Sequence, residues 1–204
     1  MELYKNYKGF ENRILSLYPN PQTIQVSKSP INKSILESLE HSRIVEVVSV
    51  LETICQGKLN TDFILSSLFS SISRKSLYYL YVEHDKIVAF CILGRENKKE
   101  FLNYIGVQQL KQYLLEQDFD LPNIISVIQQ SDYVTYSISI LCSCKKGKGR
   151  ELIDQIPSTI NQNSFVVTVD SPLKNLKKYY QSLGFIYDKN LYDWSGTIYK
   201  IIEK

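Results

Sequence analysis

The stretch SILCSCKKGKGRELI, residues 139–153, constrains the fold of this chain more than any other part of the sequence. A run rich in β-branched and apolar residues ends there, and four basic residues are interspersed with two glycines before a helical pattern begins. A strand that enters a helix through a glycine-rich loop leaves backbone N–H groups without partners at the helix start, where the helix dipole favours negative charge. The segment therefore predicts a site for a phosphate or pyrophosphate. Its basic residues are Lys145, Lys146, Lys148 and Arg150.

The familiar nucleotide-binding motifs do not fit this loop. A Walker A loop needs Gly-x-x-x-x-Gly-Lys-Ser/Thr, and the dinucleotide fingerprint needs Gly-x-Gly-x-x-Gly. Neither spacing occurs in KKGKGR. Two alternatives stay open: a basic surface loop without a ligand, and a nucleic-acid-binding patch, which would need further basic or aromatic residues on the same face.

Overall charge and hydropathy limit the classes of partner. With 204 residues, 44% hydrophobic and 22% charged, the chain has the composition of an ordinary globular protein. Its 24 basic residues nearly balance 21 acidic ones, so nucleic acid is not the expected partner. The N-terminus lacks the apolar core of a signal peptide, and the apolar stretch IVAFCIL is far shorter than a membrane span. We therefore expect a cytoplasmic protein without a membrane partner.

Four cysteines occur, at positions 55, 91, 142 and 144. Cys142 and Cys144 would share one face of a strand, but a zinc site needs further ligands, and His41 and His84 are isolated. A cysteine nucleophile needs an activating base, and no histidine lies near this pair in sequence. We expect no metal, and four reduced thiols in an intracellular protein.

The middle of the chain predicts strands interrupted by a long segment. LYYLYVE and KIVAFCILG are two strand patterns joined by a tight turn at His84 and Asp85. Residues 95–131 then interrupt the strands, with a helix expected at 106–116, before YVTYSISILCS predicts another strand. Residues 1–76 are mainly helical in pattern, with a strand as an alternative at RIVEVVSV and a short strand within PNPQTIQVSKSP.

The C-terminal part adds two helices and three strands. A helix over 147–156 follows the basic loop, and Pro157 should end or kink it. SFVVTVD predicts a buried strand, and a second helix begins with Asp170 or Ser171 as its N-cap and ends at Gly184. FIYDK and GTIYKIIE predict the last two strands. This order of elements indicates a mixed α/β domain.

Two of these segments together resemble the GCN5-related N-acetyltransferase (GNAT) family. In that family a strand ends in Arg/Gln-x-x-Gly-x-Gly/Ala before a helix, and a later helix ends in Tyr-x-x-x-Gly-Phe. Here the first motif falls on residues 144–149 and the second on Tyr180, Gly184 and Phe185. The resemblance implies a GNAT-like α/β fold: a mixed, mostly antiparallel sheet flanked by helices, with a splayed central strand pair.

The resemblance covers residues 77–200 and implies one domain. Residues 77–204 would form the acetyl-CoA-binding core with an insert at about 95–131, and residues 1–76 would be a substrate-side segment of the same domain. The insert could cover the acceptor site or contribute to a homodimer.

Three positions depart from the family pattern. Cys144 stands where the family has Arg or Gln, and Leu173 stands where an asparagine commonly precedes the tyrosine by seven positions. Pro157 bends or shortens the helix after the loop. The first departure removes one expected pyrophosphate ligand, which the neighbouring lysines would replace.

Acetyl-CoA is the co-substrate that the resemblance implies. Its pantetheine arm would hydrogen-bond to the exposed strand backbone of Ile140, Leu141 and Cys142. Its pyrophosphate would lie on the loop and the first turn of the helix, which comprise Lys145, Lys146, Gly147, Lys148, Gly149, Arg150 and Glu151.

In the family an amine attacks the thioester directly, a base or water chain removes its proton, and an acid protonates the leaving thiolate. Tyr180 matches the acid, and a phenol with a pKa near 10 is a suitable donor. Tyr180 would also fill the core in a purely structural role. Candidates for the base are Asp132 and Glu83, or a water relay through Tyr136, Ser137 or Ser139.

The sequence thus predicts an N-acetyltransferase that transfers the acetyl group of acetyl-CoA to an amine of a small molecule or protein. The alternative is a non-catalytic acyl-CoA-binding module, because the strand YVTYSISIL carries no carboxylate and Cys144 departs from the motif.

Overall fold

The computed structural model describes residues 22–30, 33, 44–56, 59–73, 76–96, 134–169, 176–188 and 197–204. These residues form a mixed α/β structure whose six strands are hydrogen-bonded in the order β1-β2-β3-β4-β5-β6. The chain divides into two compact units, and each is described by itself: Met1–Gly94 with Ser139–Thr159, and Arg95–Ile138 with Ile160–Lys204. None of the described helices is long and apolar enough to cross a membrane.

The first unit is built on a strand hairpin. β2 (Leu77–Glu83) pairs antiparallel with β3 (Lys86–Glu96), and β1 (Gln22–Gln25) pairs parallel with β2. His84 and Asp85 join the hairpin with φ angles of 48° and 57°, as a two-residue turn with two positive φ angles requires. The two strands and the turn that the sequence predicts are therefore confirmed.

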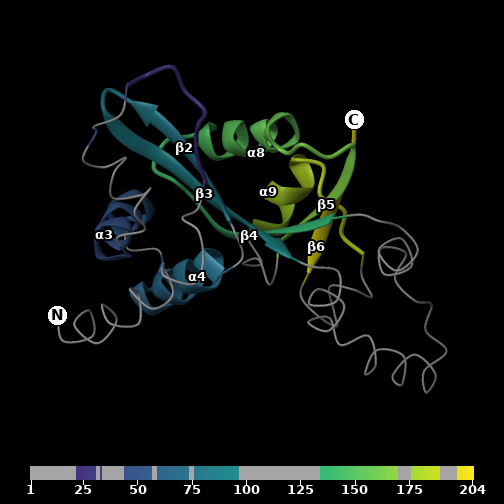
Figure 1. Ribbon diagram of the computed structural model, residues 1–204, viewed down its shortest axis with the longest axis horizontal. Coiled ribbons are helices and arrows are strands. Elements are labelled where there is room, and N and C mark those ends of the chain that lie inside the picture. Colours follow the sequence, from purple (N-terminus) through teal and green to yellow (C-terminus); the bar gives the residue numbers. More distant parts are fainter. Residues whose placement is uncertain are drawn as a thin grey trace. The chain divides into compact units, whose positions relative to one another are not determined.

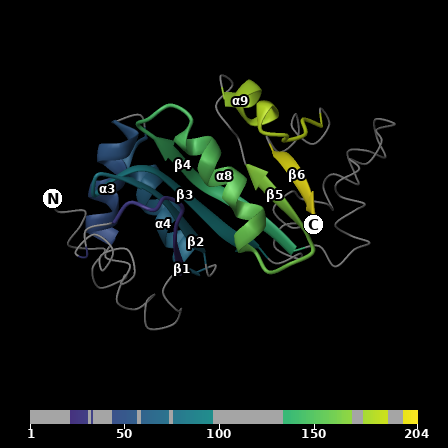
Figure 2. The same cartoon turned by 90° about the horizontal axis from the view of Figure 1, so that it is seen from above.

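Helices lie on both faces of this hairpin. Figures 1 and 2 show α8 (Lys148–Thr159) on one face and both α3 (Ile44–Cys55) and α4 (Thr61–Ser73) on the other. The strand alternative for RIVEVVSV is wrong, because its residues from Ile44 onward begin α3. Val47, Val48, Leu51 and Ile54 of α3 are buried, and their i, i+1, i+4, i+7 spacing follows the helical period rather than the alternation of a strand.

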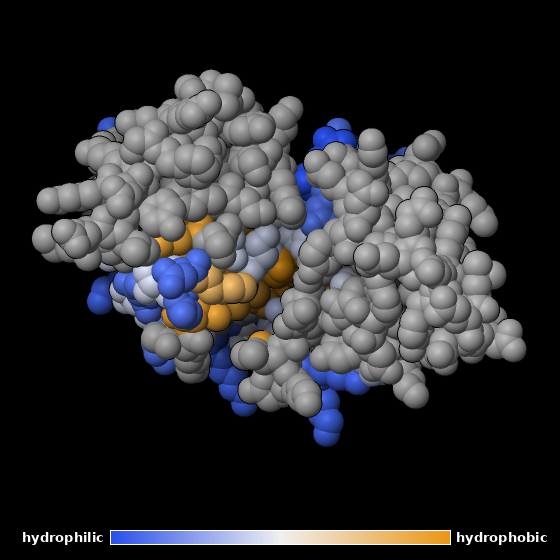
Figure 3. Space-filling view, turned by 90° about the horizontal axis from the view of Figure 1, so that it is seen from below, coloured by the Kyte–Doolittle hydropathy of each residue, from blue (hydrophilic) through white to orange (hydrophobic). Residues whose placement is uncertain are grey.

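Apolar side chains from α3, α4, β2, β3 and the end of β4 (Val134–Ser143) form the core of this unit. The cluster includes Leu51, Leu68, Leu80, Phe90 and Ile140, each at most 2% exposed. Apolar side chains also reach the surface among hydrophilic ones, as the space-filling view shows in orange and blue (Figure 3). Phe63 of α4, which is 49% exposed, is the largest of the exposed apolar residues in the described part of this unit.

Helix α8 continues beyond the point at which the sequence predicts its end. Pro157 lies inside the helix, which ends at Thr159 instead of near residue 156. The proline lacks the N–H that would donate to the Ile153 carbonyl, four residues earlier. The Ser158 hydroxyl donates to the Gln155 carbonyl at 2.8 Å and the Thr159 hydroxyl donates to the Ile156 carbonyl at 3.1 Å, so side chains bond these two carbonyls near the end of the helix.

The second unit contains the first half of β4 and three further elements. Residues Val134–Ser137 pair parallel with β5 (Ser164–Val169), and β5 pairs antiparallel with β6 (Ile198–Glu203). A short helix, α9 (Lys177–Ser182), precedes β6. FIYDK is not a full strand, because it contributes one isolated bridge, Ile186 to Tyr199. The sheet is therefore mixed, with β1·β2 and β4·β5 parallel and β2·β3 and β5·β6 antiparallel.

Some predictions lie outside the described residues. The segment predicted as an insert at 95–131 begins within β3, which runs to Glu96, and its remainder is outside them. Asp132 and the N-cap candidates Asp170 and Ser171 are also outside them. The domain boundary at residue 76 and the splayed strand pair stay predictions.

Candidate functional site

The junction between β4 and α8 is a compact turn held by its own backbone. The Cys144 N–H donates to the Val88 carbonyl at 3.0 Å, which fixes the end of the strand to β3. The Ser143 hydroxyl donates to the Lys145 carbonyl at 2.6 Å and accepts from the Lys145 N–H at 3.2 Å. The Lys148 N–H then donates to the same carbonyl at 3.3 Å, and α8 begins at Lys148. The predicted sequence of strand, loop and helix is confirmed.

Gly147 gives this turn its shape. Its φ angle is +85°, a conformation that glycine adopts without the steric cost that other residues incur. A Cβ atom added there would meet no atom within 4 Å. Among the described residues, no hydrogen-bond acceptor faces the N–H groups of Lys146, Gly147 and Gly149. The loop thus presents unused amide donors beside open space at the start of a helix.

Two lysines of the loop, Lys145 and Lys148, are paired with neighbouring side chains. Lys145 forms an ion pair with Glu83 of β2. Lys148 contacts the Glu151 carboxylate at 2.7 Å and donates to the Tyr81 hydroxyl at 2.7 Å. Its ammonium group lies 4.1 Å from the centroid of the Tyr81 ring and 3.7 Å from Glu83. Nucleic-acid binding becomes less favourable, because carboxylates already partner Lys145 and Lys148 of the loop.

These contacts lower the pKa values of the two carboxyl groups and raise the pKa of Lys148. The hydrogen bond from Lys145 lowers the pKa of Glu83 below its ordinary value of 4.5. Hydrogen bonds to Glu151 and Tyr81 raise the pKa of Lys148, and the bond from Lys148 lowers the pKa of Glu151. Glu83 is therefore a carboxylate at neutral pH and a weak proton acceptor, which is unfavourable for the general base that the sequence suggests.

Tyr81 takes part in this cluster although the sequence analysis does not single it out. Tyr81 and Glu83 are two residues apart on β2 and so point to the same face of the strand. That spacing on a predicted strand is the signal that could have grouped Tyr81 with Glu83.

The strand backbone proposed for the pantetheine arm carries a covalent bond that the sequence analysis misses. Cys142 is joined to Cys55 of α3 by a disulfide, with a Cα–Cα distance of 5.5 Å. The expectation of four reduced thiols is therefore wrong. Free thiols remain at Cys91, where burial raises the pKa to about 12, and at the exposed Cys144. In the described part of the chain, no three His, Cys, Asp or Glu side chains gather as a metal site.

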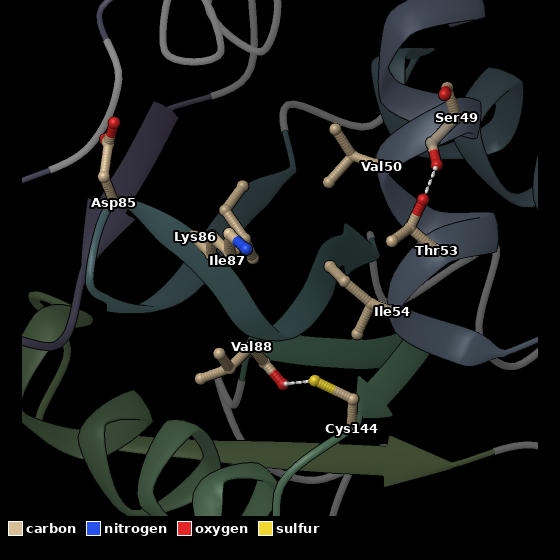
Figure 4. A pocket seen from close by; sticks show the side chains of 9 residues that line it. All are labelled: Ser49, Val50, Thr53, Ile54, Asp85, Lys86, Ile87, Val88 and Cys144. Atoms are coloured by element: carbon tan, nitrogen blue, oxygen red, sulfur yellow. Dashed lines mark hydrogen bonds between the residues drawn. The ribbon is translucent and has the colours of Figure 1, made fainter.

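A pocket of about 310 Å³ lies between α3 and β3, next to this loop. Its apolar walls are Val50 and Ile54 of α3 and Ile87 and Val88 of β3 (Figure 4). Cys144 closes one end, and its thiol donates to the Val88 carbonyl at 3.3 Å. The pocket is large enough for a small apolar group, and the sequence analysis does not predict it.

Tyr180, the predicted acid, belongs to the second unit and has a clear structural role there. Its carbonyl accepts the Phe185 N–H at 3.1 Å, while the Gln181 carbonyl accepts the Gly184 N–H at 3.0 Å. Gly184 has a φ angle of +84°, so these bonds form the Schellman motif that ends α9. The rings of Tyr180 and Phe185 pack edge to face at 5.4 Å, and Tyr180 is 5% exposed. The predicted stop at Gly184 is confirmed.

The candidates for a water relay lie on β4. Tyr136 is buried against Phe165 with ring centroids 5.7 Å apart, and burial raises its pKa, so its phenol stays protonated at neutral pH. Ser137 is buried, and Ser139 is partly exposed. Both serines can pass a proton between an acceptor and a donor, whereas the tyrosine is a poor base.

No protein-family model and no curated protein sequence matches the chain. Among solved structures, an N-acetyltransferase from Staphylococcus aureus Mu50 is similar, with 16% sequence identity. The similarity covers 77% of this chain and 93% of that one, with a TM-score of 0.37. A likeness of this size does not establish a shared activity.

Proposed function

We propose that this protein is an N-acetyltransferase that uses acetyl-CoA as its acetyl donor. The observation that carries the proposal is the loop between β4 and α8, where the amides of Lys146, Gly147 and Gly149 have no acceptor among the described residues and a Cβ added at Gly147 would meet no atom within 4 Å. The GNAT-like motifs at residues 144–149 and 180–185 add the family-level expectation to this local geometry.

The pyrophosphate of acetyl-CoA would accept hydrogen bonds from these amides. Oriented amides and a helix dipole stabilise an anion without a bound metal. The side chain of Lys145, which is 56% exposed, can reach a ligand from the loop. The pantetheine arm would run along the backbone of Ile140, Leu141 and Cys142, as an added strand does.

The chemistry is a direct acetyl transfer. The neutral amine attacks the thioester carbonyl carbon, a C–N bond forms, and the C–S bond breaks. The amine proton passes to a base or to water, and the CoA thiolate receives a proton from an acid. Tyr180 is the proposed acid, and Asp132 or a serine-linked water chain on β4 is the proposed route for the amine proton.

A second function, an acyl-CoA-binding module without catalysis, is favoured by specific contacts. Tyr180 is nearly buried and ends a helix, and Glu83 is held as a carboxylate by Lys145. Both residues thus have structural duties that do not require catalysis. This alternative keeps the loop as the cofactor site and removes the transfer step.

The binding step is tested with Gly147→Asp and its matched control Gly147→Asn. Both side chains tolerate a positive φ better than most residues, so the variants differ mainly in charge. We expect acetyl-CoA binding, measured by calorimetry, to weaken at least about tenfold more in Gly147→Asp, because a carboxylate beside the amides repels the pyrophosphate. Equal affinity of the two variants for acetyl-CoA would show that the loop is not part of the binding site.

The transfer step is tested by incubating the protein and acetyl-CoA with a panel of amines. Released CoA is separated by chromatography, because a thiol reagent would also react with the exposed Cys144. Amine-dependent release that falls at least about tenfold in Tyr180→Phe supports the acetyltransferase and the acid. Tight binding without amine-dependent release from any amine supports the binding module.

A further inference from the structure

The loop already holds an anion of the protein itself. Glu83 extends from the end of β2, and its two carboxylate oxygens contact two lysines of the loop: Oε2 pairs with Lys145, and Oε1 lies 3.7 Å from Lys148. A carboxylate is a weaker but chemically similar substitute for a phosphate oxygen, because both accept charge-assisted hydrogen bonds from ammonium groups.

The two lysines are held to different degrees. Lys148 keeps two other partners, Glu151 at 2.7 Å and the Tyr81 hydroxyl at 2.7 Å, and its side chain is 17% exposed. Lys145 has Glu83 as its acidic partner, and its side chain is 56% exposed. Lys148 can therefore stay in place when a ligand arrives, whereas Lys145 can exchange partners by rotating its exposed stem.

We propose that Glu83 is an internal competitor for the anion-binding loop, and that it sets the affinity and the charge selectivity of this site. A ligand phosphate must take Lys145 away from the carboxylate, so only an anion of higher charge than a carboxylate gains from the exchange. The inference rests on the proposed function in one respect, that the loop binds phosphate groups. Glu83 thereby acquires a role other than the general base.

The first test uses inorganic pyrophosphate as the probe, so that it does not depend on CoA chemistry. Calorimetry compares the wild type with Glu83→Gln, which keeps the shape of the side chain and removes its charge. We expect pyrophosphate to bind about tenfold more tightly to Glu83→Gln, because Lys145 then lacks a competing charge. Unchanged or weaker binding would overturn the inference, since Glu83 would then be inert or would orient the lysines.

The matched control is Asp85→Asn, in the neighbouring turn. Asp85 is exposed and has φ of 57°, which asparagine adopts readily, and no ion pair of Asp85 is found in the described part of the chain. The Asp85→Asn substitution removes one negative charge near the loop, as Glu83→Gln does, but it does not release a lysine from an ion pair. We expect its pyrophosphate affinity to stay within about twofold of the wild type, as expected for a screened surface charge. A gain equal to that of Glu83→Gln would overturn the inference in favour of a general charge effect.

A double-mutant cycle identifies the lysine through which Glu83 acts. In the wild type, Lys145→Gln should weaken pyrophosphate binding little, because the lysine is shared with Glu83; in the Glu83→Gln background the same change should remove most of the gain. Additive effects of the two substitutions on pyrophosphate affinity would contradict the proposal that Lys145 leaves Glu83 to bind the ligand.

CoA and phosphate-free pantetheine separate this inference from the proposed function. If Glu83→Gln tightens the binding of CoA and leaves the binding of pantetheine unchanged, the inference and the proposed function both stand. If the wild type binds CoA but Glu83→Gln binds it no better, the inference fails and the function survives. If pyrophosphate binds more tightly to Glu83→Gln while CoA binds to neither protein, the inference stands and the proposed function fails.

Discussion

Gly147 and Gly184 occupy the same region of backbone space, with φ angles of +85° and +84°, but their surroundings differ. Around Gly184 the hydrogen-bonding groups are satisfied: the helix carbonyls accept from Gly184 and Phe185, and Lys200 donates to the Leu183 carbonyl at 2.8 Å. Around Gly147, the N–H groups of Lys146 and Gly147 have no acceptor in the described part of the chain, and a Cβ added at Gly147 would meet no atom within 4 Å. A glycine turn that uses its donors ends a helix, whereas one that leaves them unused can bind a ligand.

The largest expected effect concerns the turn at Gly184, called the packed turn because its hydrogen-bonding groups are satisfied. Phe185→Ala removes a ring that is 4% exposed and packs on Tyr180, so the free energy of unfolding should fall by about 3 kcal/mol. Chemical denaturation measures the loss. The control, Ile186→Ala, changes a side chain that is 45% exposed and should cost less than about 1 kcal/mol. Similar losses for the two variants would contradict the packing role of Phe185.

The next effect compares the two glycines directly. Alanine strains the backbone at each position, so Gly147→Ala and Gly184→Ala should each lower the free energy of unfolding by about 1–2 kcal/mol. Their effects on ligand binding should differ. Pyrophosphate binding should weaken in Gly147→Ala and stay at the wild-type value in Gly184→Ala, and calorimetry on both folded variants checks this. If pyrophosphate binding weakened in Gly184→Ala alone, the anion site would have to be assigned to the turn at Gly184 instead of the turn at Gly147.

A smaller effect concerns the cap on the packed turn. Lys200→Met keeps the apolar stem and removes the hydrogen bond to the Leu183 carbonyl, which should lower the free energy of unfolding by about 1 kcal/mol. Lys178→Met, on the exposed side of α9, is the control and should change stability by less than about 0.5 kcal/mol. Equal stabilities of the two variants would show that solvent replaces the lysine as donor.

The smallest effect is electrostatic and concerns the pair of Lys145 and Glu83 beside the turn at Gly147. The pKa of Glu83 lies below 4.5 in the folded protein because Lys145 is bonded to it. The stabilisation from this pair is therefore present above the unfolded-state pKa and is lost as the pH falls through the lowered folded-state value. Carboxyl resonances followed by NMR through acidic pH should show Glu83 titrating closer to 4.5 in Lys145→Gln than in the wild type. Lys86→Gln should leave the titration unchanged.

Local sequence signals predicted the turns at Gly147 and Gly184, because each turn depends on residues that are close in sequence. The hairpin at His84 and Asp85, the start of α8 and the stop at Gly184 all follow from neighbouring residues whose backbone needs are specific. The end of α8 was misplaced, because Pro157 was expected to end the helix, whereas the helix continues through it for two more residues.

The partners of the site were not predictable in the same way. Lys145 and Glu83 are 62 residues apart, and Cys55 and Cys142 are 87 apart. Each pair depends on how α3 and β2 pack against the end of β4, and single-sequence periodicity carries no information on that packing. The β4 to α8 loop was therefore recognised as a basic loop, while its internal carboxylate and the adjacent pocket emerged only from the fold.

The bond between Cys55 and Cys142 has a consequence for the connectivity of the molecule. It closes residues 55–142 into a covalent ring, which includes β2, β3 and every residue between them and β4. A protease that cuts the backbone once anywhere inside this ring leaves a single molecule of unchanged mass on a non-reducing gel. Two fragments separate only after a reductant opens the ring.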